Sequence, residues 1–137
     1  MGTRAAVIRF DPATWQDRVA DDLRLMRDVS ERDLTIYQAA VEKSHFRLFR
    51  VTAWGEFAGW VIWSIDKEPD GFSLVINAAA ILPVPGHDVT GAMFDAFEAM
   101  GRQTGARTLR AWTTRPGLRR KLETRGAQTR FEMEYEL

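Results

Sequence analysis

The sequence predicts an α/β (α+β) fold, with a mixed central sheet of six to seven strands and helices on both faces. Three observations predict it. A continuous apolar run at 72–82 follows the turn residues Pro69-Asp70-Gly71, which is typical of a strand buried on both faces. Two aromatic and β-branched runs precede it at 46–54 and 57–65. An apolar stripe at helical spacing follows it at 88–100.

Length and composition narrow the possibilities further. A chain of 137 residues that is 45% hydrophobic suits one domain, 1–137, with a sizeable core. The absence of cysteine excludes disulfides and thiolate metal sites and suits a reducing compartment, so we expect a cytoplasmic protein. Two histidines without clustered carboxylates predict no transition-metal site. A net charge of zero and short apolar runs argue against nucleic-acid and membrane partners.

The N-terminal third predicts a strand and two helices. Residues 4–10 are expected to form the strand, and Asp11 is expected to cap a helix with Pro12 at its first position. The apolar face of this helix recurs at helical spacing through Trp15, Val19, Leu23 and Met26. Ser30 and Asp33 resemble a capping box, which begins a second helix that ends near residue 44.

The runs at 46–54 and 57–65 predict a hairpin. Gly55-Glu56 separates them, and a type II′ turn would need a positive φ at Gly55. Both faces of each run are partly apolar, so the sheet should be covered on both sides. We interpret Trp54, Trp60 and Trp63 as core residues in preference to a ligand platform.

The C-terminal third predicts a helix, a strand, a helix and a strand. Asp88 caps the first helix, Gly101 and Gly105 end it, and residues 108–113 form the strand. A basic helix at 116–125 ends at Gly126, and residues 131–137 alternate apolar side chains with glutamates, as in a half-buried strand. The arginines of this third indicate a solvated face, with an anion or partner surface as the alternative. The residues expected in the core are Trp60, Ile62, Leu74, Ile76, Met93, Phe97 and Leu109.

The predicted order, β-α-α-β-β-β-α-β-α-β, resembles that of the GNAT superfamily of acyl-CoA-dependent N-acetyltransferases. The resemblance covers essentially the whole chain as element order and is strongest from Phe46 onward. It implies that the pantetheine arm of acetyl-CoA would lie along Ala80, Ile81 and Leu82. The pyrophosphate would lie at the next helix N-terminus, on the candidate residues Gly86, His87, Asp88, Val89, Thr90 and Gly91.

The sequence departs from the family's pyrophosphate motif. Gly86 stands where the family has Gln or Arg, and Val89 stands where it has a central Gly. A β-branched residue hinders the close backbone approach that glycine allows, and Asp88 adds a carboxylate beside the site. His87 could supply a compensating donor or partial charge.

The catalytic positions depart as well. Leu122 stands where many members have a tyrosine that protonates the departing thiolate, while Thr114 and Ala127 replace a common Asn and Phe. The fourth strand offers only Ser73 and Asn77, neither of which is a base. The sequence therefore nominates no catalytic and no metal-binding residue.

Two functions stay open. The first is a GNAT-fold protein that has lost acetyl transfer, needs no cofactor, and acts as a structural or interaction protein through a protein partner or self-association. Its short chain and degenerate loop resemble those of bacteriophage virion proteins with this fold, which would place it in a virion. The alternative is an active N-acyltransferase that uses acetyl-CoA with an atypical pyrophosphate loop and solvent as the general acid.

Overall fold

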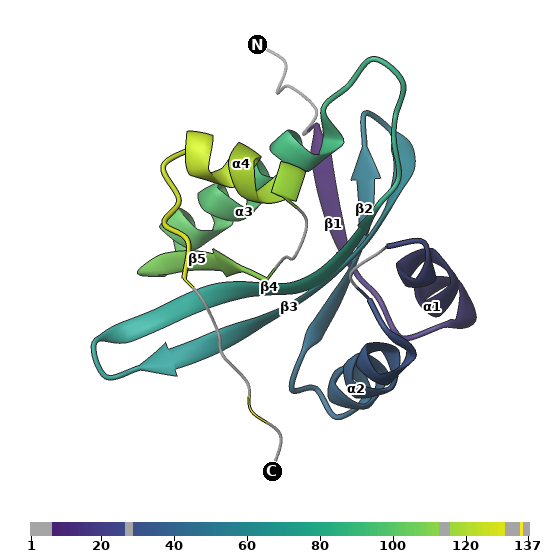
Figure 1. Cartoon of the computed structure of the whole chain (residues 1–137), viewed down its shortest axis with the longest axis horizontal. Helices are drawn as coiled ribbons and strands as arrows, with labels where there is room; N and C mark the ends of the chain where they lie inside the picture. Colours follow the sequence, from purple (N-terminus) through teal and green to yellow (C-terminus); the bar gives the residue numbers. More distant parts are fainter. Residues whose placement is uncertain (1–6, 27–28, 113–115, 131–134, 136–137) are drawn as a thin grey trace.

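The computed structural model describes residues 7–26, 29–112, 116–130 and 135. They form a sheet with helices, in the order expected for the first nine elements (Figure 1). The elements are β1 (Ile8–Pro12), α1 (Asp17–Arg24), α2 (Glu31–Glu42), β2 (Arg47–Ala53), β3 (Glu56–Glu68), β4 (Gly71–Ile81), α3 (Val89–Thr104), β5 (Thr108–Ala111) and α4 (Pro116–Thr124). None of the described helices combines the length and the hydropathy of a membrane-spanning segment.

The sheet is mixed and has five described strands in the order β1-β2-β3-β4-β5. The first four strands pair antiparallel, and β5 pairs parallel with β4. The expectation of six to seven strands is therefore not met by the described residues. The five strands seen are the first five predicted, and the predicted strand at 131–137 lies outside the described residues except for Tyr135.

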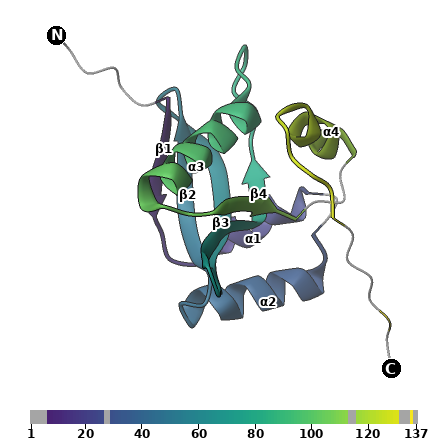
Figure 2. The same ribbon diagram turned by 90° about the vertical axis from the view of Figure 1, so that its left-hand side faces the viewer.

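Helices cover both faces of the sheet, as the apolar faces of its strands required (Figure 2). On one face α3 packs through Met93 and Phe97, with α4 against the same cluster. On the other face α1 and α2 pack against Trp60 and Ile62. Six of the seven expected core residues are buried; Leu109 is half-buried, because β5 is the last described strand at its edge of the sheet.

The expected helix start at Asp11-Pro12 is wrong. Both residues belong to β1, where Pro12 lies opposite Phe49 of β2, and α1 begins only at Asp17. Pro12 is tolerated because β1 is the edge strand in this part of the chain and need not use every backbone N–H. Pairing with β2 therefore outweighs a local helix-start signal.

The hairpin between β2 and β3 exists, but its turn differs from the expected one. The two turn residues are Trp54 and Gly55, with φ of 48° and 79°. Two positive φ values indicate a type I′ turn, not type II′, and this type matches the twist of the flanking strands. Trp54 is 36% exposed in this turn, so the core interpretation holds for Trp60 and Trp63 only.

Helix ends follow the sequence closely. Ser30 and Asp33 form a complete capping box at the start of α2. Gly126 has φ of 98°, Gly126 N–H donates to Glu123 O, and Ala127 N–H donates to Leu122 O. These are the two bonds of a Schellman motif, so the predicted C-cap glycine after α4 is confirmed.

Candidate functional site

β4 has a strand on both sides over its first half only. β5 pairs with residues from Ser73 to Ile76, and Trp112 N–H donates to Ile76 O at 3.2 Å. β3 continues to pair with β4 as far as Ile81. No described residue pairs with the outer side of residues 77–81, which we call the open edge. The sheet thus opens where the pantetheine arm was expected.

The strand pairing decides which residues face the open edge. Leu82 N–H donates to Ala58 O at 2.9 Å, so Leu82 directs its backbone toward β3. Because residues of an antiparallel pair alternate, Ala80 does the same, and Ala79 and Ile81 direct theirs outward. Of the three residues expected along the arm, Ile81 therefore offers outward backbone groups. Ala79, which the sequence reasoning did not name, offers the other set.

The start of α3 is capped by Asp88, as expected. The Asp88 carboxylate accepts a hydrogen bond from Gly91 N–H at 3.0 Å. A Cβ on Gly91 would lie 2.4 Å from the Asp88 carboxylate, so a glycine here leaves room for this cap. Val89 is 4% exposed and packs in the core beneath α3, and Thr90 is half-buried. One positive helix end is thus already in contact with a carboxylate.

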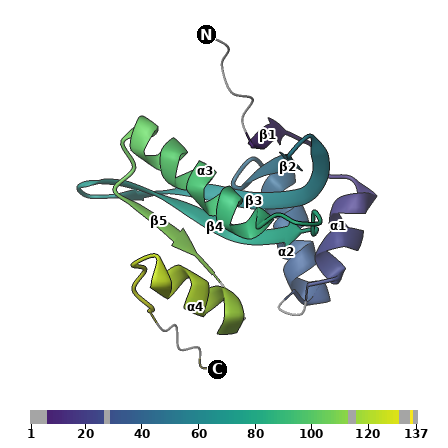
Figure 3. The ribbon, with the colours of Figure 1, turned by 90° about the horizontal axis from the view of Figure 1, so that it is seen from above.

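α4 approaches the same place and supplies a cation. Lys121 Nζ donates to Asp88 Oδ1, although 33 residues separate the two in sequence. The hydrogen bond from Lys121, followed by that from Gly91 N–H, holds the pKa of the Asp88 carboxyl below its ordinary value. Arg125, the residue after α4, adds ion pairs to Asp95 and, at 3.7 Å, to Glu98 of α3. Figure 3 shows α3 running along the sheet with α4 beside β5.

The loop before α3 is held by an aromatic stack. The His87 ring lies on Trp54 with centroids 3.9 Å apart and planes at 19°. Gly86, just before it, has φ of 78°, which favours glycine at that position. His87 therefore joins the loop to the β2–β3 turn, and its ring is already engaged with an aromatic neighbour.

A polar cluster lies where the open edge begins. Ile62 pairs with Ala78 and Trp63 with Ile76, so Asn77 is the extra residue of a bulge. Asn77 Nδ2 donates to Ser64 Oγ at 2.9 Å, and Tyr37 Oη of α2 donates to Asn77 O at 3.4 Å. The sequence reasoning placed Tyr37 only on an apolar helix face, because 40 residues separate it from Asn77.

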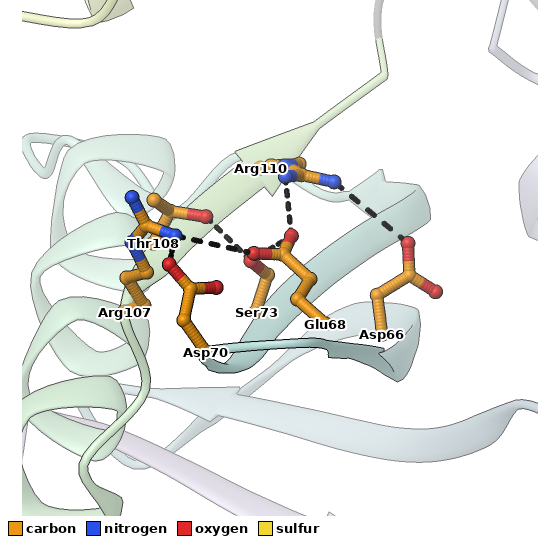
Figure 4. A network of polar contacts seen from close by, with 7 residues as sticks. All are labelled: Asp66, Glu68, Asp70, Ser73, Arg107, Thr108 and Arg110. Carbon is orange, nitrogen blue, oxygen red and sulfur yellow. Dashed lines mark hydrogen bonds and ion pairs between the residues drawn. The ribbon is translucent and has the colours of Figure 1, made fainter.

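Ser73, the other polar residue considered in β4, belongs to a closed network (Figure 4). Its side chain is fully buried, donates to Glu68 Oε1 at 2.9 Å, and lies 2.6 Å from Thr108 Oγ1. Arg110 also pairs with Glu68, and Arg107 pairs with Asp70. Ser73 thus ties β4 to β3 and β5, and its hydroxyl is not accessible to a substrate.

The other positions considered for catalysis or metal binding carry no suitable groups among the described residues. Leu122, at the position of the family's tyrosine, is half-buried against the core cluster and has no proton to donate. No three His, Asp or Glu side chains among the described residues lie together as a metal site. The described site thus consists of an open strand edge, a capped helix start and a small hydroxyl–amide cluster.

The fold is that of the GNAT acetyltransferases. No family model and no curated protein matches the sequence, so the likeness is one of structure. A ribosomal-protein-alanine N-acetyltransferase from Brucella melitensis biovar Abortus 2308 superposes with a TM-score of 0.66 at 14% identity. The match covers 95% of this chain and 97% of that one.

Two further solved structures match at similar coverage. An integron cassette protein from the mobile metagenome of V. cholerae has a TM-score of 0.66 at 15% identity, covering 97% of this chain and 93% of that one. AAC(6')-Iy, in complex with the bisubstrate analogue CoA-S-monomethyl-acetylneamine, has a TM-score of 0.58 at 14% identity, covering 95% and 97%. At these identities the likeness concerns the fold, and the site must carry any claim about function.

Proposed function

We propose that this chain uses the GNAT fold as a non-catalytic interaction protein that has lost acetyl transfer. The observation that carries the proposal is the Asp88 carboxylate, which accepts Gly91 N–H and pairs with Lys121 at the start of α3. The protein's own carboxylate thus occupies the helix end at which the fold family would hold a pyrophosphate.

The charge of the Asp88 carboxylate disfavours the binding of a pyrophosphate at the start of α3. A helix N-terminus contributes only about 0.3–1 kcal/mol to an exposed anion, and Asp88 already uses that contribution. An incoming pyrophosphate would lie beside the Asp88 charge and would have to separate Lys121 from it. Leu122 supplies no acid for a departing thiolate. An active acetyltransferase would need another site for the pyrophosphate and another group to protonate the thiolate.

On this proposal the ligand is a protein, either a partner or a second copy of the chain, and no cofactor is needed. Exposed apolar side chains are available for such contacts, among them Leu25 and Ile36 near α1 and α2 and Trp112 after β5. Membership of a bacteriophage virion is the narrower form of the proposal, supported by the resemblance of the short chain and degenerate loop to such proteins.

Calorimetry with acetyl-CoA and coenzyme A tests the proposal directly. We expect no measurable binding to the unmodified protein and detectable binding to Asp88→Asn, which keeps an N-cap side chain and removes the charge. Asp95→Asn is the matched control, because Asp95 also pairs with α4 through Arg125 but does not cap α3. Micromolar acetyl-CoA affinity in the unmodified protein would refute the proposal.

The open edge of β4 favours a second candidate, an acetyl-CoA-dependent N-acyltransferase with an atypical loop. The outward backbone groups of Ala79 and Ile81 suit the amides of a pantetheine arm, and the Tyr37 hydroxyl lies where that edge begins. For this candidate we expect acetyl-CoA-dependent thiol release with an amine acceptor, lost or slowed in Tyr37→Phe. Absence of thiol release across peptide, polyamine and aminoglycoside acceptors would eliminate it.

A further inference from the structure

A pocket at the opposite edge of the sheet from β5 takes no part in the site described above. It lies at the sheet edge where β1 has ended. The β1–α1 connection, the end of α2, the start of β2, Trp63 of β3 and Met100 of α3 line it. Trp15, Phe46 and Phe49 line it with half-buried rings, and the buried ring of Trp63 contributes another part of its wall. Four of the thirteen lining residues are thus aromatic, and aromatic and apolar side chains with a few polar groups are common in small-molecule sites.

One of the lining residues, Arg47, carries a positive charge. Arg47 is exposed, and its guanidinium carbon lies 5.3 Å from the centroid of the Trp63 ring. Within the described part of the chain, no carboxylate pairs with Arg47. Glu42 also lines the pocket, but it is exposed and accepts a hydrogen bond from Gln38 Nε2 at 3.0 Å. A guanidinium near an aromatic ring can bind a carboxylate through its planar donors.

Ser44, another lining residue of the pocket, has a left-handed backbone conformation that lowers stability. Ser44 has φ of 62° at the end of α2, where its N–H donates to Val41 O and His45 N–H donates to Ala40 O. The ends of α3 and α4 have the same bonding pattern, but there the residue is Gly105 or Gly126. A serine strains this left-handed position and a glycine does not.

A second costly feature lies in the pocket wall. Trp63 is 5% exposed, and its indole N–H has no hydrogen-bond acceptor among the described residues. A buried donor without an acceptor costs about 1–3 kcal/mol, and such groups are rare in folded proteins. Local costs that gather at one place indicate a site shaped for something other than stability.

From these observations we propose that the pocket binds a small carboxylate with a flat aromatic body. The carboxylate pairs with Arg47, the body packs against the ring of Phe49, which lies in the same cluster as Trp63, and Ser44 offers a hydroxyl in the pocket wall. The proposal does not depend on the function proposed above, because β3 and β4 separate the pocket from the open edge.

The test is a titration with 3-phenylpropionate. Calorimetry and the tryptophan indole resonances in ¹⁵N-correlated NMR spectra monitor the binding. Its uncharged amide and acetate are the comparison ligands, since one lacks the charge and the other lacks the body. We expect binding of 3-phenylpropionate only, with a shift of the Trp63 indole resonance and none of Trp112, which lies after β5. Trp63→Phe assigns the resonance.

Variants locate the contact. Arg47→Gln should weaken 3-phenylpropionate binding about tenfold, and Arg120→Gln on α4 should leave it unchanged. Arg47→Lys, which keeps the charge but not the planar fork, should lie between them. Ser44→Gly should raise the unfolding temperature and weaken binding. Equal affinity for acid and amide, a shift at Trp112 instead of Trp63, or unchanged affinity in Arg47→Gln or Ser44→Gly would overturn the proposal.

Discussion

The two halves of β4 differ in their neighbours although they are one strand. The first half, residues 71–76, lies between β3 and β5 and is cross-linked by the Ser73–Glu68–Thr108 contacts. The second half, residues 77–81, has β3 on one side and no described strand on the other. The first half closes the sheet with buried polar bonds, and the second leaves backbone groups available for a ligand or partner.

The largest effect is expected where β3 supports the second half. Gly59 pairs with Ile81, has φ of 123°, and a Cβ there would lie 1.8 Å from Ala80 O. Gly59→Ala should therefore lower the free energy of unfolding by about 3 kcal/mol or more, measured by urea denaturation. Gly71→Ala in the first half is the control, because its φ is also positive but nothing lies within 4 Å of its Cβ. Equal losses in both variants would show that strain, and not contact, limits both halves.

The next effect concerns the first half. Ser73→Ala removes a fully buried hydroxyl and leaves Glu68 and Thr108 each without one partner. We expect a loss of about 1–3 kcal/mol in urea unfolding, because two hydrogen bonds, each contributing about 0.5–1.5 kcal/mol, are removed. Asn77→Ala, at a half-buried position in the second half of β4, should lower the free energy of unfolding by less. A double-mutant cycle of Ser73→Ala with Thr108→Val should show coupling; strict additivity would mean that the 2.6 Å contact contributes nothing.

Local patterns predicted much of this architecture and little of the contrast between the halves. The apolar run of β4, the capping box at Ser30, the cap at Asp88 and the glycine after α4 all depend on residues within a few positions of one another. Short-range spacing determines caps and periodicity, so a single sequence reveals them.

The misses share one cause, which is pairing between distant residues. Asp11 and Pro12 match the local pattern of a helix start, but they pair with β2 and belong to a strand. The parting of β4 from β5, the Lys121–Asp88 pair and the Tyr37–Asn77 bond join positions tens of residues apart. Tertiary packing overrides local preference at such places, and no local spacing predicts them.

A smaller effect is expected at the end of α4. Lys121 of this helix pairs with Asp88 at the start of α3, the helix that follows the second half of β4. Gly126→Ala places a Cβ at φ of 98° and should cost about 1 kcal/mol. Nothing lies within 4 Å of that Cβ, so the loss should come from backbone strain alone. Gly117→Ala within the same helix is the control and should be neutral or stabilising. Thermal unfolding of the two variants distinguishes these outcomes.

The smallest effect is the pH dependence of the Asp88–Lys121 pair beside the second half. Because the folded-state pKa of Asp88 is lowered, first by Lys121 and then by Gly91 N–H, its contribution to stability is complete above the ordinary carboxyl pKa of about 3.9. That contribution disappears as the pH falls through the lowered folded-state value. The Asp88 side chain is 60% exposed, so solvent and salt screen the pair to about 0.5 kcal/mol. Lys121→Met should raise the Asp88 pKa in a ¹³C carboxyl titration and reduce stability at pH 7, and the reduction should shrink as the pH falls below the ordinary carboxyl pKa. An unchanged titration midpoint would mean that Gly91 N–H alone lowers it, and that α4 does not neutralise the charge at the start of α3.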